Sequence, residues 1–247
     1  MIIRPQKLIQ APLLIVLFTV CHLTPALGAD TTPFHNESEA GVVITSGNSR
    51  AQSYNFKQLN SYEFEGNVVK LTGHYLGTQS NGVESARNWG LGLRYERILS
   101  EKFSVFASES LESDIFAGYL QRYNTDVGGK TEIVKTEDFN WISEGGYRYT
   151  TENRLNPPNA NSHFVRLYTE LNRAWTKSFS TRYWLEVLPN LTDSQAYQVN
   201  SELSLSAVLT SLLSLKTAYG IKYNHLPAPG VLETTDSQFT TALVAKF

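Results

Sequence analysis

The last eleven residues, 237–247, read S-Q-F-T-T-A-L-V-A-K-F and decide the fold. Two sets of side chains alternate along this stretch. One set is mostly apolar and comprises Phe239, Thr241, Leu243, Ala245 and Phe247, while the other is more polar and comprises Gln238, Thr240, Ala242, Val244 and Lys246. A period of two is typical of a β-strand whose faces meet different surroundings. The stretch ends on an aromatic residue, whereas chain ends in water usually fray.

Two interpretations of this terminal strand compete. In a closed membrane barrel the last strand pairs with the first, and a terminal aromatic residue suits the boundary between lipid and water. The pattern is also similar to the signal that outer-membrane assembly machinery reads, which would here consist of Phe239, Thr241, Leu243, Ala245 and Phe247. The alternative is an ordinary edge strand at the end of a soluble sheet.

The first 29 residues have the pattern of a secretory signal peptide. Arg4 and Lys7 precede an apolar run over 11–21, and small residues at 26–29 suit cleavage. The run is too short to span a bilayer comfortably, and Val20 ahead of Cys21 disfavours a lipoprotein. We therefore expect a signal peptide over 1–29, a short periplasmic lead over 30–38 and a barrel over 39–247.

Composition excludes several functional classes. Of the 247 residues, 41% are hydrophobic and 18% are charged, and Cys21 is the only cysteine. Removal of the signal peptide would leave no disulfide framework and no cysteine metal site. The formal net charge of −2 gives no support for nucleic-acid binding, which needs a clustered basic surface. No later stretch approaches the length of an apolar transmembrane helix.

Alternating segments recur along the remaining chain and predict twelve strands. We expect them at 39–46, 51–62, 67–77, 88–99, 103–111, 119–134, 139–150, 163–175, 179–188, 196–209, 213–224 and 237–247. A tight turn is expected at 47–49, and short turns at 63–66, 100–102, 135–138, 176–178 and 210–212. Longer loops are expected at 78–87, 112–118, 151–162, 189–195 and 225–236. This alternation of short and long connections is typical of outer-membrane barrels and places both chain ends on the short-turn, periplasmic side.

A closed transmembrane barrel would satisfy the backbone of these twelve strands. In hydrocarbon every backbone N–H and C=O needs a partner, so a sheet can span a membrane only if it has no free edge. Aromatic residues fall near the predicted strand ends, as a membrane girdle would place them: Tyr62, Tyr95, Phe103, Phe139, Tyr149, Trp175, Phe179 and Tyr223. A soluble sandwich or periplasmic barrel is the alternative, although its strands are usually shorter.

Charged residues of both signs occupy the polar positions of these strands. The candidate lumen charges are Lys70, Arg94, Glu96, Arg122, Asp126, Lys130, Glu144, Arg148, Arg166, Glu170, Arg182, Glu186, Glu202, Lys216 and Lys222. They can pair with one another and fill the interior, or they can line a narrow polar passage. Twelve strands lie between filled and open barrels, so strand number does not decide between these options. The density of charge favours a largely occupied lumen.

Several short motifs resemble a family of salt-induced outer-membrane proteins of unknown function. They are G-V-V-I-T-S-G-N-S at 41–49, F-A-G-Y-L-Q-R-Y at 116–123, G-G-K at 128–130, and E-G-G-Y-R-Y at 144–149 followed by Glu152. The resemblance covers the whole predicted mature chain, and Leu120 departs from its pattern. It implies an outer-membrane location and expression linked to salt, and it supplies no catalytic or binding residues.

The sequence gives little support for catalysis. His74 is the only histidine placed within a predicted strand on its polar face, and no His, Asp and Glu spacing resembles a metal site. We expect no cofactor and no enzyme activity. The leading hypothesis is a monomeric membrane-integrity or narrow-pore protein linked to salt or osmotic response, whose partners are outer-membrane lipid, assembly machinery and ions or small solutes. An outer receptor using 78–87, 151–162 and 225–236 is the alternative, followed by a lipid hydrolase using His74.

Overall fold

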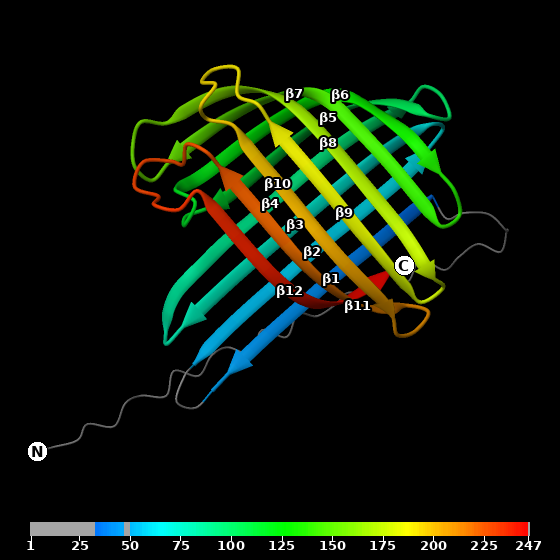
Figure 1. Cartoon of the computed structure of the whole chain (residues 1–247), viewed down its shortest axis with the longest axis horizontal. Coiled ribbons are helices and arrows are strands. Elements are labelled where there is room, and N and C mark those ends of the chain that lie inside the picture. Colours follow the sequence, from blue (N-terminus) through cyan, green and yellow to red (C-terminus); the bar gives the residue numbers. More distant parts are fainter. Residues whose placement is uncertain (1–32, 47–49, 247) are drawn as a thin grey trace, which may run out of the picture. The chain divides into compact units, whose positions relative to one another are not determined.

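The computed structural model describes residues 33–46 and 50–246. Every strand pairs antiparallel with its neighbours in the chain, and β1 pairs with β12 to close the ring (Figure 1). The prediction of a twelve-stranded antiparallel barrel is therefore confirmed. The predicted signal peptide lies outside the described residues. The strands are β1 Phe34–Thr45, β2 Ala51–Phe64, β3 Asn67–Ser80, β4 Val83–Ile98, β5 Phe103–Asp114, β6 Tyr119–Lys135, β7 Phe139–Arg154, β8 Ala160–Thr176, β9 Phe179–Leu188, β10 Gln198–Val208, β11 Leu213–Asn224 and β12 Thr235–Lys246.

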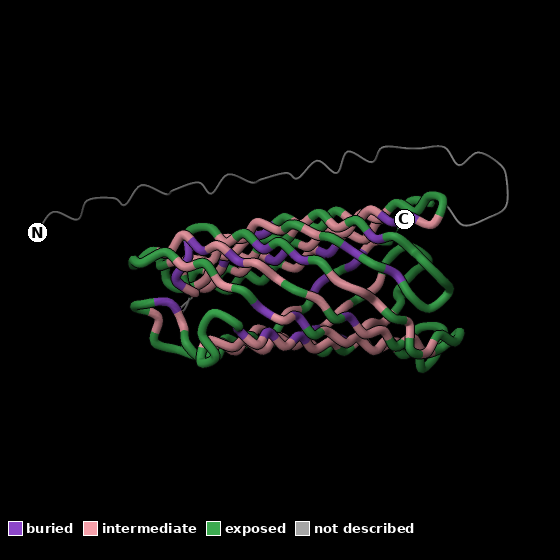
Figure 2. Tube along the Cα trace, turned by 90° about the horizontal axis from the view of Figure 1, so that it is seen from above, coloured by how far each residue is buried: buried purple, intermediate pink, exposed green. Residues whose placement is uncertain are grey.

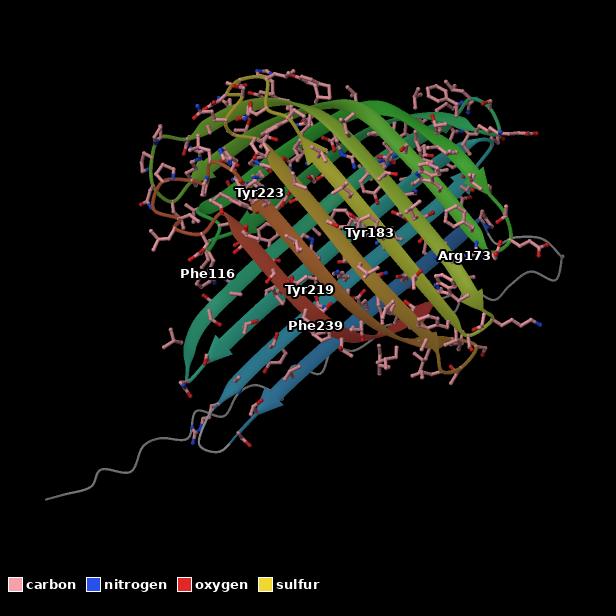
Figure 3. The ribbon with its side chains drawn as sticks, in the orientation of Figure 1. Phe116, Arg173, Tyr183, Tyr219, Tyr223 and Phe239 are labelled. Carbon is pink, nitrogen blue, oxygen red and sulfur yellow. The ribbon has the colours of Figure 1, made fainter. Side chains whose placement is uncertain are left out.

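The barrel is apolar outside and polar inside, the reverse of a soluble protein. Tyr183, Tyr219 and Phe239 project from the outer surface of β9, β11 and β12 (Figure 3). Further exposed apolar side chains include Leu71, Leu91, Leu93, Val127, Leu167, Leu203 and Leu243. The buried polar side chains include Asn55, Glu96, Asn124, Asp126, Glu144, Arg166 and Glu186. This distribution is that of a membrane-spanning barrel, whose strands alternate lipid-facing and lumen-facing residues.

The two ends of the barrel differ. One end, here called the turn end, carries residues 33 and 246 and the connections 65–66, 99–102, 136–138, 177–178 and 209–212. The opposite end, here called the loop end, carries residues 46 and 50 and the connections 81–82, 115–118, 155–159, 189–197 and 225–234. Buried positions lie along the strands, while the connections at both ends are largely exposed (Figure 2). Both ends of the described chain thus lie on the side of the shorter turns, as predicted.

The predicted loop over 78–87 is wrong. β3 continues to Ser80, β4 begins at Val83, and only Asn81 and Gly82 connect them. Both residues have positive φ, 51° and 80°, as a tight two-residue hairpin turn requires. The stretch is polar, which favoured a loop, but its backbone groups are paired across the hairpin. The connection predicted at 151–162 is also shorter, because β7 and β8 leave only 155–159 between them.

The first strand begins earlier than predicted. β1 starts at Phe34, within the expected lead over 30–38, and pairs with β2 from this first residue onward. Polar side chains support the pairing: Asn36 donates to Asn60 at 2.6 Å, and Ser38 donates to Gln58 at 2.7 Å. A polar sequence thus forms a strand because its side chains and backbone are bonded to the next strand. The predicted turn at 47–49 lies outside the described residues.

The terminal strand has the predicted two faces. Phe239 and Leu243 are exposed on the outside, whereas Ala242 and Val244 are buried on the inside. Phe247 lies outside the described residues, and the assembly signal of which it is part stays a prediction. Within 33–46 and 50–246, no helix has the length and apolarity needed to cross a membrane.

Candidate functional site

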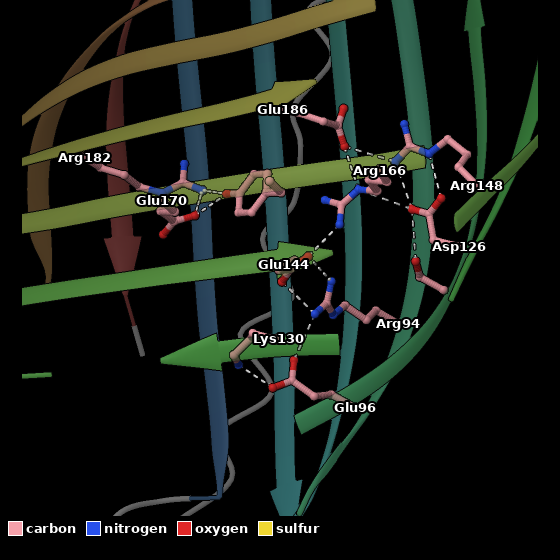
Figure 4. Close-up of polar contacts among 12 residues, drawn as sticks. Arg94, Glu96, Asp126, Lys130, Glu144, Arg148, Arg166, Glu170, Arg182 and Glu186 are labelled. Atoms are coloured by element: carbon pink, nitrogen blue, oxygen red, sulfur yellow. Dashed lines mark hydrogen bonds and ion pairs between the residues drawn. The ribbon is translucent and has the colours of Figure 1, made fainter. Parts of the chain in front are cut away.

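The barrel interior carries a network of ion pairs on β4 to β9. Because strand residues two apart share a face, the charged residues of these strands point together into the lumen. Arg166 on β8 is the centre of this network (Figure 4). Its guanidinium donates to Glu144 on β7 at 2.6 Å and to Glu186 on β9 at 2.7 Å. One buried arginine therefore connects three strands.

Arg148 extends the network toward the loop end. It donates to Asp126 on β6 through two bonds of 2.6 and 2.9 Å, and to Glu186 at 3.2 Å. The paired contact with Asp126 is the geometry that a planar guanidinium makes with a carboxylate. Arg166 also lies 3.8 Å from Asp126. Two arginines and two carboxylates thus form a closed cluster on the barrel wall.

Arg94 extends the network toward the turn end. It reaches from β4 to Glu144 on β7, with bonds of 2.8 and 3.1 Å, and it also donates to Glu96 at 3.2 Å. Its guanidinium lies 3.7 Å above the ring of Phe106 on the intervening strand β5, a favourable cation–π contact. Glu96 is held further by an ion pair from Lys130 and a 2.8 Å bond from Ser104. Lys130, Glu96, Arg94, Glu144, Arg166, Glu186, Arg148 and Asp126 thus form one chain of contacts, here called the ion-pair network.

Glycines of the sequence motifs lie beneath this network, where a larger side chain would not fit. Gly128 and Gly146 pair across β6 and β7. A Cβ at Gly128 would lie 2.6 Å from the Gly145 carbonyl oxygen and 2.9 Å from the Phe106 ring, and one at Gly146 would lie 2.5 Å from the Val127 carbonyl oxygen. The two motifs that contain these glycines also contain Lys130, Glu144 and Arg148. They therefore supply both the charges and the space that the charges occupy.

A second set of ion pairs lies on the other part of the wall. Arg182 on β9 donates to Glu170 on β8 at 2.6 Å and lies 3.8 Å from Glu202 on β10. Lys57 on β2 also reaches Glu202, at 3.2 Å, although β2 and β10 are not neighbours. Lys216 on β11 reaches across β12 to Glu39 on β1 at 2.8 Å. These longer contacts connect parts of the barrel that the strand ladder does not pair directly.

Three predicted lumen charges lie apart from both sets. Arg122 pairs with Glu152 at 2.7 Å and lies over the Tyr119 ring at 3.7 Å. Glu152 also accepts a bond from Arg154 at 2.9 Å. Lys70 and Lys222 make no ion pair with the residues that the structure describes, and they line different cavities.

Two cavities occupy the interior on either side of the ion-pair network. The cavity at the turn end has a volume of about 900 Å³, and Arg94, Glu144 and Arg166 form part of its lining. The cavity at the loop end is smaller, about 210 Å³, and Arg148 and Glu186 form part of its lining. The bond between Arg166 and Glu186 therefore joins groups that line different cavities. The network therefore lies between the two cavities.

The connection 225–234 covers the loop-end cavity. It joins β11 to β12, half-way round the ring from the 115–118 connection between β5 and β6. A Cβ at Gly118 would nevertheless lie 2.8 Å from Val231. Asn156, in the connection between β7 and β8, donates to the Pro229 carbonyl oxygen at 2.8 Å. Loops from opposite sides of the barrel therefore meet over its mouth.

Sequence reasoning missed several interior residues. Glu39, Lys57 and Glu152 were not among the candidate charges, although each occupies an inward position of an alternating strand. Phe106 and Tyr119 point inward and support arginines, a role that was predicted for no aromatic residue. His74 lies against Gly90 on the inner face of β3. No metal-binding group of three or more His, Cys, Asp or Glu side chains occurs among residues 33–46 and 50–246.

The fold is that of known outer-membrane channels. The NanC porin superposes with a TM-score of 0.53 at 10% sequence identity, and the alignment covers 85% of this chain and 98% of the porin. An outer-membrane channel from Pseudomonas putida F1 gives a TM-score of 0.51 at 12% identity, covering 87% of this chain and 94% of that protein. At these identities the similarity concerns the fold alone.

One family model matches most of the chain. No curated protein matches it. The family model described as "Protein of unknown function, DUF481" matches residues 38–247, which include every strand except the first four residues of β1. The chain therefore belongs to the DUF481 family of proteins of unknown function.

Proposed function

We propose that this protein is a narrow channel of the outer membrane that passes ions or small polar solutes. The observation that carries the proposal is the position of the ion-pair network between two cavities, one at each end of the lumen. Both ends of the described chain would lie on the periplasmic side, as in other outer-membrane barrels. The similarity in fold to outer-membrane channels supports this location.

The proposed mechanism follows from the charge arrangement. Arginines and carboxylates alternate along the network, so a passing ion or polar solute would meet partners of both signs. Pore selectivity in such a constriction depends on the charged side chains that line it. Because each guanidinium already has carboxylate partners, a solute would have to replace these contacts transiently. We therefore expect low conductance and little preference for one sign of charge at the network.

The test is conductance of the refolded protein in a planar bilayer, after an unboiled gel has shown the compact barrel. Wild type should show small, steady steps, and Arg94→Ala should increase their size because it removes the side chain that spans β5 and β6. Lys135→Ala is the matched control, since Lys135 pairs with Glu132 on the exposed turn end. Silence from a folded wild-type barrel and from folded Arg94→Ala would contradict the channel.

We also propose that the protein serves in the response to salt and has no catalytic activity. The first part rests on the sequence resemblance described above, and the second on the sparse histidines. Growth at raised NaCl should increase the amount of the transcript, and an unchanged transcript level would remove the link to salt. Replacement of His74 by alanine should leave lipid turnover by the purified protein at background; turnover that disappears on this replacement would make the protein an enzyme.

A further inference from the structure

The closure between β1 and β12 is much shorter than the strands themselves. Only four positions pair, from Glu37 with Lys246 to Ala40 with Leu243. The same strand β1 pairs with β2 over its entire length, from Phe34 to Thr45. If the register with β12 continued, residues 41–45 would face residues 238–242, but the described residues of these two segments do not pair. The two strands meet near the turn end and separate toward the loop end (Figure 1).

Gly41 marks the point where the pairing stops. A Cβ at this position would lie 2.5 Å from the Thr241 carbonyl oxygen. The two backbones therefore approach closely at Gly41, which directly follows Ala40, the last paired residue of β1. Past this residue, 42–45 of β1 and 235–240 of β12 do not pair with each other, and this unpaired part of the seam is here called the notch. The notch lies in the loop-end half of the barrel, which corresponds to the outer leaflet in the proposed orientation.

The side chains of β1 at this notch are apolar on both faces. Val42, Val43 and Ile44 follow one another and are 54, 58 and 65% exposed. Val43 points inward, as Glu39 does. If polar side chains filled the lumen here, we would expect this position to be buried or to carry a polar residue. Across the notch, Phe239 on β12 is 69% exposed. Consecutive exposed apolar residues at a strand edge fit surroundings that are hydrocarbon on both sides.

We propose that the notch between β1 and β12 is a lateral site for a lipid acyl chain of the outer leaflet. A second protein strand would satisfy the unpaired backbone edge, but it would not account for apolar side chains on the lumen side of β1. An acyl chain accounts for both faces, because it can reach around the strand edge. Lys222 and Asp236 on β11 and β12 line the loop-end cavity, so this cavity lies beside the notch. The site would give amphiphilic molecules a sideways route between lumen and lipid, beyond the proposed passage of ions.

Site-directed spin labelling tests this site directly, because the described chain contains no cysteine. Single cysteines replace Val43 at the notch, Leu203 on the lipid face and Thr72 on the lumen face, and the labelled proteins are reconstituted in phosphatidylcholine vesicles. Molecular oxygen, which concentrates in lipid, and a water-soluble nickel chelate report the surroundings of each label. The ratio of oxygen to nickel collisions at Val43 should match that at Leu203 and exceed that at Thr72 about tenfold, equivalent to about 1.4 kcal/mol of partitioning.

A second label at Thr240, on the β12 side of the notch, provides an independent position if Val43→Cys does not fold. A ratio at both positions equal to that at Thr72 would overturn the proposal in favour of a water-filled notch. Magnetic broadening between labels on different molecules would also overturn it, since a second copy of the chain would then cover the edge. Neither result depends on conductance, so the lateral site and the channel can fail separately.

Discussion

Two parts of the barrel wall are held together by different interactions. On β4 to β9, long strand ladders are reinforced by a buried ion-pair network in which Arg94, Arg148 and Arg166 each contact two or more carboxylates. At the β1–β12 seam, four paired positions close the ring, and the unpaired edge of β1 beyond them carries the apolar side chains of Val42, Val43 and Ile44. Charged side chains thus cross-link the wall of β4 to β9 at many points, while the seam has a short backbone ladder and the ion pairs that Lys246 and Lys216 make with Glu37 and Glu39 of β1.

The largest effect is expected from loss of the central arginine. Arg166→Met would leave Glu144 and Glu186 without one of their guanidinium partners in a buried site. Removal of one partner of a buried ion pair costs about 3–5 kcal/mol. The change should lower the urea concentration at which tryptophan fluorescence reports unfolding in vesicles. Lys135→Met is the control, and equal midpoints for the two variants would mean that the network does not stabilise the wall.

A glycine replacement should have a smaller effect on the same wall. Gly128→Ala places a methyl group against the Gly145 carbonyl oxygen and the Phe106 ring, which supports Arg94. Overpacking of this kind costs about 1–3 kcal/mol. The same unfolding measurement should show a loss, whereas Gly145→Ala, where a Cβ would meet no atom within 4 Å, should behave as wild type. Equal losses in both variants would indicate a general intolerance of alanine in these strands.

The seam should open more readily than the charged wall. Backbone amides in segments with few paired neighbours exchange their hydrogens through local opening of low free energy. Among residues 41–45, amides directed toward β12 should therefore exchange about tenfold or more faster than those of 144–148, a difference of about 1.4 kcal/mol or more. Hydrogen-exchange mass spectrometry of the reconstituted barrel provides the measurement. Equal protection would show that the seam is as firmly closed as the β6–β8 wall.

The smallest effect is expected for an ion pair in water. Arg173 and Asp138 lie 3.0 Å apart at the turn end, with 43 and 54% of their side chains exposed. Exposed ion pairs contribute about 0–1 kcal/mol because solvent screens them. Asp138→Asn should therefore leave the unfolding midpoint almost unchanged, and added salt should not alter the comparison with wild type. A decrease in the unfolding midpoint as large as that of Arg166→Met would contradict the expectation that buried ion pairs stabilise the barrel more than exposed ones.

Strand number and the two faces of the wall followed from the alternation of side chains, because a strand directs successive residues to opposite sides. Predictions failed where polarity was taken as a loop signal. Residues 78–80, 83–87 and 34–38 are mostly polar, yet they pair as strands because the ladder satisfies their backbone groups and because polar side chains such as Asn36 and Asn60 bond each other. Polarity indicates exposure to water, and strands of a membrane barrel can continue into water.

The sequence by itself determined the barrel, its inward charges and the glycine-rich motifs, since all three depend on local periodicity and composition. The tertiary structure alone decided which charges meet. Arg94 reaches Glu144 across two strands, and Lys57 reaches Glu202 from a strand that is not its neighbour. Such partners depend on strand register and on the curvature of the closed wall. The short β1–β12 ladder has the same origin, because the geometry of closure brings together the first and the last strand of the described chain.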